Sequence, residues 1–316
     1  MLVLATLYWG LSFPVIKALT TINRLQFPDG GSWFVSAQAV APRFVAAVVI
    51  MLVFGGLSEG LPTLAEAKQG LMVGFFAAAG AFLQTDAMQF IDASSSAFLT
   101  QFSAILVPAW IAVRSRRNPG ILIWVCCAIV LAGVSVLGHF DWRTMRLGRG
   151  GWETLLSAAA YTGQILWIGK REYAGNRART VTFIMFAVQA VAFSILAART
   201  APSLRALVAP WYSPVWVALT LTLAVVCTIG AFSLMTSWQP VISETEAGLI
   251  YCVEPVFASV FALFVPAIIS RFAGIDYPNE RATYSLLVGG GLVTLANVLI
   301  QMNALRSAAP DSSEIE

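Results

Sequence analysis

Residues 36–56 read SAQAVAPRFVAAVVIMLVFGG, and Arg43 is the only ionisable side chain among them. A bilayer core of about 30 Å is crossed by about 20 mostly apolar residues in helical conformation. This stretch therefore has the length and the composition of a transmembrane helix. It lacks the alternation of apolar and polar residues that a strand of a membrane barrel needs.

Similar apolar blocks fill the rest of the chain. Of its 316 residues, 58% are hydrophobic and 11% are charged, against about 25% charged residues in soluble domains. A chain with so few charges cannot cover a water-facing surface. We predict an all-α integral membrane protein with ten transmembrane helices, at residues 2–19, 36–56, 70–90, 94–113, 119–138, 152–170, 180–198, 213–237, 245–266 and 283–302.

The sequence also repeats itself at a distance of about 150 residues. Three pairs of segments match in the same order: Tyr8-Trp9-Gly10 with Tyr161-Thr162-Gly163, Gln38-Ala39-Val40-Ala41 with Gln189-Ala190-Val191-Ala192, and Gly80-Ala81-Phe82 with Gly230-Ala231-Phe232. We predict two five-helix repeats at 1–149 and 150–303 and a disordered tail at 304–316. Because five is odd, the second repeat must be inverted, as in many secondary transporters whose site lies at mid-membrane.

Positive charges orient the helices only weakly, because they divide almost evenly between the two sets of loops. The cluster from Arg114 to Arg117 favours a cytoplasmic N-terminus. The first helix starts at Met1 without a basic region or a cleavage site, so we expect it to be retained; a trimmed or misassigned start is the alternative. We expect a multi-pass protein of the cell membrane, the inner membrane of a bacterium.

The order of these motifs resembles the drug/metabolite transporter superfamily, in particular its EamA-type ten-helix members. The resemblance rests on Trp9 to Lys17 in the first helix, Arg43 in the second, Ala97 to Pro108 in the fourth, Ala247 to Pro255 in the ninth, and Glu280 with the following glycine-rich span. Cys126 and Ala296 depart from it, standing where the family often has glycine. The fourth helix also lacks the Glu-Pro pair of the ninth. The resemblance implies transport of a metabolite or drug, with helices five and ten bracing the bundle.

Glu254 lies about midway along the expected ninth helix, beside Pro255. An ionisable group within a span costs about 2.5–3.5 kcal/mol on insertion scales, so it calls for a reason. Proline also removes a donor one turn earlier and loosens the helix. We predict that Glu254 carries protons during transport. The alternative is a glutamate that stays protonated and bonds to a neighbouring helix.

Arg43 is the expected binder of a carboxylate or phosphate group on the substrate. Asp86 is expected on the same side of the membrane and is the natural ion-pair partner of Arg43. Lys17 is also expected there, as a side chain that reaches the interface. The repeat places Thr236 opposite Asp86 and Ser194 opposite Arg43, so this charge cluster belongs to one half only.

Five uncharged side chains complete the predicted substrate cavity: Trp9, Gln101, Tyr161, Gln164 and Tyr251. The glutamines would bind polar groups, and the aromatic rings would form flat walls. Each has a plainer interpretation as an interhelical hydrogen bond or a packing residue.

Catalytic and metal-binding motifs are missing from the sequence. It has one histidine, His139, and no His-Glu-x-x-His, Gly-x-Ser-x-Gly or Walker pattern. Its four cysteines fall in apolar spans and suit packing. We predict a secondary transporter that is not an enzyme, with no metal or cofactor. Its partners would be a small-molecule substrate and the bilayer, not nucleic acid, and the working unit is either a monomer or a homodimer. A passive channel, or a membrane-embedded enzyme, is the alternative.

Overall fold

The computed structural model describes residues 1–55, 60–115, 121–137, 148–242, 247, 250–251 and 253–308. In this part the secondary structure is helical throughout. The helices, in chain order, are α1 (Leu2–Gln26), α2 (Ser32–Val53), α3 (Leu64–Ala87), α4 (Ala93–Thr100), α5 (Ser103–Ser115), α6 (Ile121–Leu137), α7 (Arg149–Ile168), η1 (Arg171–Tyr173), α8 (Ala178–Thr200), α9 (Leu204–Val208), η2 (Ala209–Tyr212), α10 (Pro214–Thr222), η3 (Leu223–Gly230), α11 (Ala231–Trp238), η4 (Gln239–Val241), α13 (Glu254–Ala262), α14 (Val265–Ala273) and α15 (Tyr284–Ala308).

Six of the described helices are long and apolar enough to cross a membrane. They are Leu2–Gln26, Ser32–Val53, Leu64–Ala87, Ala93–Arg114, Ala178–Thr200 and Pro214–Val241. The pair α13 and α14, bent by 49°, would make a seventh if it forms one span. Helices also occupy the predicted ranges 119–138, 152–170 and 283–302, although α6, α7 and α15 are not among the six. The chain is thus an all-helical membrane protein in the part described.

Outward-facing apolar side chains agree with a lipid environment. On α8, Val191 and Ile195 lie one turn apart and are 59% and 57% exposed, and Phe75 on α3 is 61% exposed. In water these side chains would form exposed apolar patches, whereas hydrocarbon solvates them without cost.

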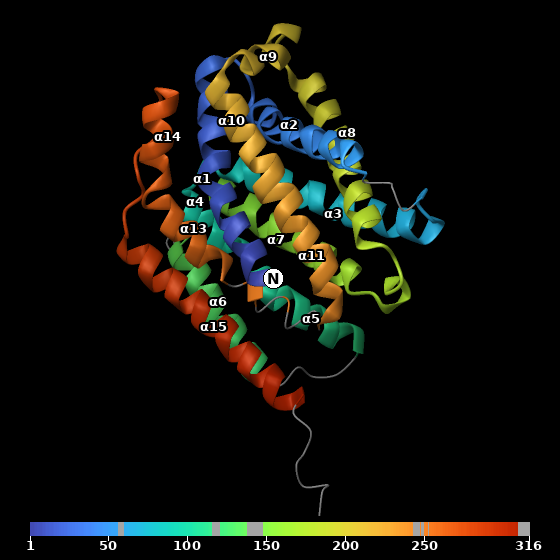
Figure 1. Cartoon of the computed structure of the whole chain (residues 1–316). Helices are drawn as coiled ribbons and strands as arrows, with labels where there is room; N and C mark the ends of the chain where they lie inside the picture. Colours follow the sequence, from blue (N-terminus) through green and yellow to red (C-terminus); the bar gives the residue numbers. More distant parts are fainter. Residues whose placement is uncertain are drawn as a thin grey trace, which may run out of the picture.

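Helix pairs distant in sequence form the bundle (Figure 1). α2 packs along α8, α3 along both α7 and α8, and α1 along the rod made by α10, η3 and α11. At one edge, α6 and α15 lie side by side. There a Cβ on Gly133 would lie 2.8 Å from the carbonyl oxygen of Gly289, so only glycine permits this backbone approach.

Polar contacts fix α3 at both ends. At its start, Glu66 completes a capping box with Thr63 and pairs with Arg177, 2.6 Å away. At its end, the buried carboxylate of Asp86 accepts hydrogen bonds from Ser36, Gln89 and Arg149. Each cluster joins α3 to a segment more than 60 residues later, because Arg177 precedes α8 and Arg149 begins α7.

Candidate functional site

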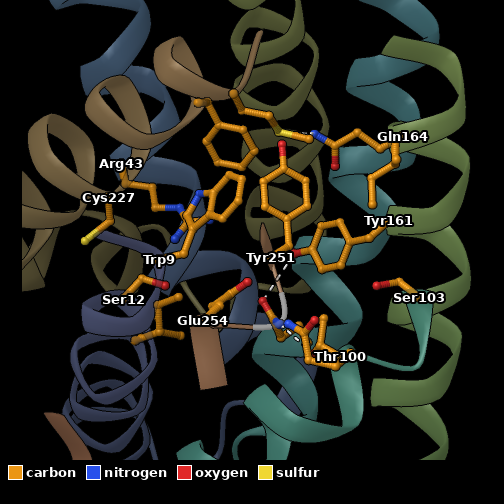
Figure 2. Close-up of a pocket in the computed structure, with 16 residues that line it drawn as sticks. Trp9, Ser12, Arg43, Thr100, Ser103, Tyr161, Gln164, Cys227, Tyr251 and Glu254 are labelled. Carbon is orange, nitrogen blue, oxygen red and sulfur yellow. Dashed lines mark hydrogen bonds between the residues drawn. The ribbon is translucent and has the colours of Figure 1, made fainter. Parts of the chain in front are cut away.

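A central cavity with an empty volume of about 680 Å³ lies among α1, α2, α3, α7, η3, α11 and the helices broken near residues 101 and 253. The residues that line it are Trp9, Ser12, Ile16, Arg43, Gln84, Thr100, Gln101, Ser103, Tyr161, Gln164, Ile165, Cys227, Phe232, Met235, Tyr251 and Glu254. Figure 2 shows the side chains of Arg43, Trp9, Tyr251, Tyr161 and Glu254 gathered around one space.

Arg43 is the only cation among the described residues of the lining. Its side chain is 6% exposed, its Nε is buried without an acceptor, and its guanidinium carbon lies 4.5 Å from the centre of the Phe44 ring. Among the described residues Arg43 has no ion-pair partner. The predicted pair with Asp86 is therefore wrong, because that carboxylate lies at the end of α3 and binds Arg149 instead.

Within the part of the lining that the structure describes, Glu254 is the only acid, and it is half-buried. It is the first residue of α13, with Pro255 directly after it, so the prediction that it lies midway along a helix is wrong. Proline suits the first turn because the amide it lacks would have no partner there. A carboxylate in this turn is also stabilised by the helix dipole. No ion pair joins Glu254 to Arg43 among the described residues.

Aromatic rings form one wall. The ring centroid of Trp9 lies 5.3 Å from that of Phe232 and 5.4 Å from that of Tyr251, in both cases edge to face. The hydroxyl of Tyr251 donates to Gln239, 2.9 Å away, and Gln239 in turn donates to the carbonyl of Ile165. These contacts fix the rings, while the indole Nε1 of Trp9 is buried without an acceptor.

Amides and hydroxyls form the opposite wall. The amide of Gln84 donates to Thr100, 3.0 Å away, and its oxygen accepts from the hydroxyl of Tyr161 at 3.2 Å (Figure 2). Among the described residues, the amide of Gln164 donates to sulfur alone: the Sδ atoms of Met185 and Met235 each lie 3.8 Å from its Nε2. Thioether sulfur is a weak acceptor, so this amide keeps most of its capacity to bind an oxygen atom.

All of the predicted cavity residues except Asp86 line this cavity: Trp9, Arg43, Gln101, Tyr161, Gln164, Tyr251 and Glu254. Asp86 is 1% exposed and lies in the separate cluster at the end of α3. Lys17 is not part of a cluster with Arg43, because it binds the carbonyl of Ile91 and the carboxylate of Asp92. Cys252, Glu244, Glu246 and His139 lie outside the described residues.

Sequence reasoning missed several lining residues. Ser12, Thr100 and Ser103 are small hydroxyl residues that could equally serve helix packing, and Cys227 was interpreted as apolar filler. Phe232 and Gln84 carried a usable signal. Phe232 ends the repeated Gly-Ala-Phe segment, and Gln84 follows the first copy of that segment by two residues.

Comparisons with known proteins give the fold alone. No family model and no curated protein matches this sequence. Among solved structures, a crystal structure of a protein is similar with a TM-score of 0.57 and 14% sequence identity, covering 97% of this chain and 99% of that one. The two chains therefore share a fold over nearly their full lengths.

Proposed function

We propose that this protein is a secondary transporter, not an enzyme, that moves a small organic solute with an acidic group across the cell membrane by alternating access. The observation that carries the proposal is Arg43, a cation in the central cavity with no carboxylate partner among the described residues. Burying a charge without a partner is costly, so an anionic group on a solute is the natural partner of this guanidinium.

Broken helices at the cavity support a transport site. One break separates α4 from α5 at Gln101, and the other precedes α13 at Val253, close to Tyr251. Gln101 and Tyr251 both line the cavity, and they stand about 150 residues apart, at the distance of the sequence repeat. Interrupted helices in corresponding positions of two repeats are the usual place of a substrate site in such transporters.

Reciprocal contacts support the proposed arrangement of ten spans in two inverted repeats. Gly80 packs against the ring of Tyr161, and its counterpart Gly230 packs against Tyr8, the counterpart of that tyrosine. Helix pairing follows the same rule. The contact of α3 with α7 corresponds to the contact of the α10–η3–α11 rod with α1, while α2 with α8 and α6 with α15 are pairs of equivalents.

A proton gradient is the proposed energy source, with Glu254 as the proton carrier. The carboxylate shares the cavity with the substrate site yet has no cationic partner among the described residues, so its proton can exchange as the cavity changes sides. A passive channel with the same helices would need no such group.

Binding of candidate solutes to the purified protein tests the substrate site. We expect an organic acid to raise the melting temperature, and Arg43→Gln to weaken its binding about 10- to 100-fold, because hydrogen bonds to charged groups contribute about 1.5–3 kcal/mol. Arg199→Gln, at an exposed arginine of α8, is the matched control. Equal binding by the Arg43 variant would remove the basis of the proposal.

Flux into proteoliposomes tests the mechanism. With Glu254→Gln we expect pH-driven uptake to be lost while exchange of labelled for unlabelled solute continues. Undiminished pH-driven uptake would argue against proton coupling at this residue, and flux without saturation would favour the channel.

A further inference from the structure

A second cavity, with an empty volume of about 830 Å³, opens where three helices end. It lies between the last turn of α2, the first turns of α8 and the C-terminal part of the α10–η3–α11 rod. Its lining comprises Ile50, Met51, Phe54, Arg179, Thr182, Ile229, Ser233, Thr236 and Ser237. None of these residues lines the central cavity, and the function proposed above makes no use of them.

The lining of this second cavity combines apolar side chains, on Ile50, Met51, Phe54 and Ile229, with four hydroxyl groups, on Thr182, Ser233, Thr236 and Ser237. The hydroxyls of Thr182 and Thr236 bond to each other and to helix carbonyls, which leaves those of Ser233 and Ser237 for a ligand. Arg179 is exposed at the mouth, where its Nη2 donates to the carbonyl of Phe54, the residue that caps α2. Among the described residues, the lining contains no acid and Arg179 has no ion-pair partner.

The ends of the surrounding helices indicate the depth of the second cavity in the bilayer. α2, α8 and the rod are three of the six helices long and apolar enough to span a membrane, and the cavity reaches from the end of α2 and the start of α8 to Ile229, nine residues before the end of α11 at Trp238. The helix ends lie at the boundary between hydrocarbon and headgroups, and Ile229 lies deeper in the hydrocarbon. Trp238, 47% exposed at the end of α11, is a side chain typical of this level.

We propose that this cavity is a binding site for an anionic phospholipid. The phosphate binds Arg179 and accepts hydrogen bonds from Ser233 and Ser237, while an acyl chain lies along the apolar residues of the lining. A zwitterionic lipid fits less well, because its ammonium group would meet a cation and find no carboxylate in the lining. The site does not depend on the transport function.

Thermal unfolding of the full-length protein in detergent tests the proposal with three additives: short-chain phosphatidylglycerol, short-chain phosphatidylcholine and glycerol phosphate. We expect phosphatidylglycerol alone to raise the melting temperature. Arg179→Gln should weaken its binding about 10- to 100-fold, the range for hydrogen bonds to charged groups, and Arg199→Gln at the opposite end of α8 should not. Equal shifts with phosphatidylcholine, or an unchanged shift in the Arg179 variant, would overturn the proposal.

A small soluble phosphate compound could bind Arg179 in the same way as a lipid phosphate. Glycerol phosphate, which has the phosphate group but no acyl chain, distinguishes these two ligands. Stabilisation by glycerol phosphate equal to that by the lipid would show an anion site without a lipid chain. Ser233→Leu gives a second variant that keeps Arg179 and fills the cavity. We expect native mass spectrometry to show bound phosphatidylglycerol on the unaltered protein and at least a tenfold lower lipid-bound fraction on Ser233→Leu. Equal occupancy would place the lipid elsewhere.

Discussion

Two equivalent contacts, one in each half of the chain, differ in chemistry. In the first half, Ser32 at the start of α2 bonds with Asp86 near the end of α3. At the repeat distance, Thr182 of α8 bonds with Thr236 of α11. The first contact belongs to a charged cluster with Arg149, while the second is a neutral hydroxyl pair beside the second cavity. In the proposed repeats, the two contacts therefore occupy corresponding positions but differ in charge.

The largest difference between the halves is expected at this pair. Asp86→Ala leaves the buried hydroxyl of Ser36 without its acceptor and removes one of the three acceptors of the Gln89 amide, and we expect a loss of about 2–3 kcal/mol in the free energy of unfolding. Thr236→Ala removes one neutral pair and should cost about 1 kcal/mol. Arg149 adds little, since its side chain is 47% exposed. Denaturant unfolding in detergent compares the two, and equal losses would contradict the asymmetry.

The two glycines that face tyrosine rings give the next comparison. A Cβ on Gly80 would lie 2.7 Å from the Tyr161 ring, whereas one on Gly230 would lie 3.3 Å from that of Tyr8. We expect Gly80→Ala to cost about 1–3 kcal/mol through overpacking. Gly230→Ala should be close to neutral, because the helix propensity of alanine, about 1 kcal/mol better than glycine, offsets the tighter contact. The melting temperatures of the two variants measure this difference. A larger decrease for Gly230→Ala than for Gly80→Ala would contradict the prediction.

The smallest expected difference concerns two asparagines, Asn23 in the last turn of α1 and Asn176 in the segment between η1 and α8. Asn23 is fully buried and accepts from the indole of Trp216, and Asn176 donates to Gln69 from a partly exposed position. We expect Asn23→Ala to lower the free energy of unfolding by about 1.5 kcal/mol and Asn176→Ala by about 0.5 kcal/mol. We expect the smaller loss for Asn176→Ala because water can replace the lost hydrogen bond at this partly exposed position. Thermal unfolding of both variants measures the two losses, and a larger loss for Asn176→Ala would contradict this prediction.

The helix positions were predicted from the lengths of the apolar blocks, and the two repeats from the spacing of matching segments. In the described part of the chain, helices occupy most of the expected ranges, because each apolar block satisfies its backbone hydrogen bonds within itself. The cavity residues could be predicted because a polar side chain within an apolar block is costly to insert into a membrane and therefore indicates a specific role. Their functional roles stay predictions.

Long-range partners could not be predicted. Arg149 stands 63 residues from Asp86, and only the folded arrangement of α3 and α7 brings the two together. The sequence distance paired Ser194 with Arg43, but Ser194 is exposed on α8 while Arg43 is buried. The spacing between matching segments varies by a residue or more, so it does not identify a single corresponding residue. The position of Glu254 in the first turn of a helix could have been predicted from the sequence, because Pro255 is a residue type favoured in that turn.

The two methionine sulfurs that hold Gln164 have a consequence for the energetics of recognition. The amide has already lost its water on folding, so the desolvation cost has been met before any solute arrives. Its present acceptors are weak, so little is lost when the amide turns away from them. For an incoming oxygen atom that displaces both sulfurs, only its own desolvation would then be set against the new hydrogen bond.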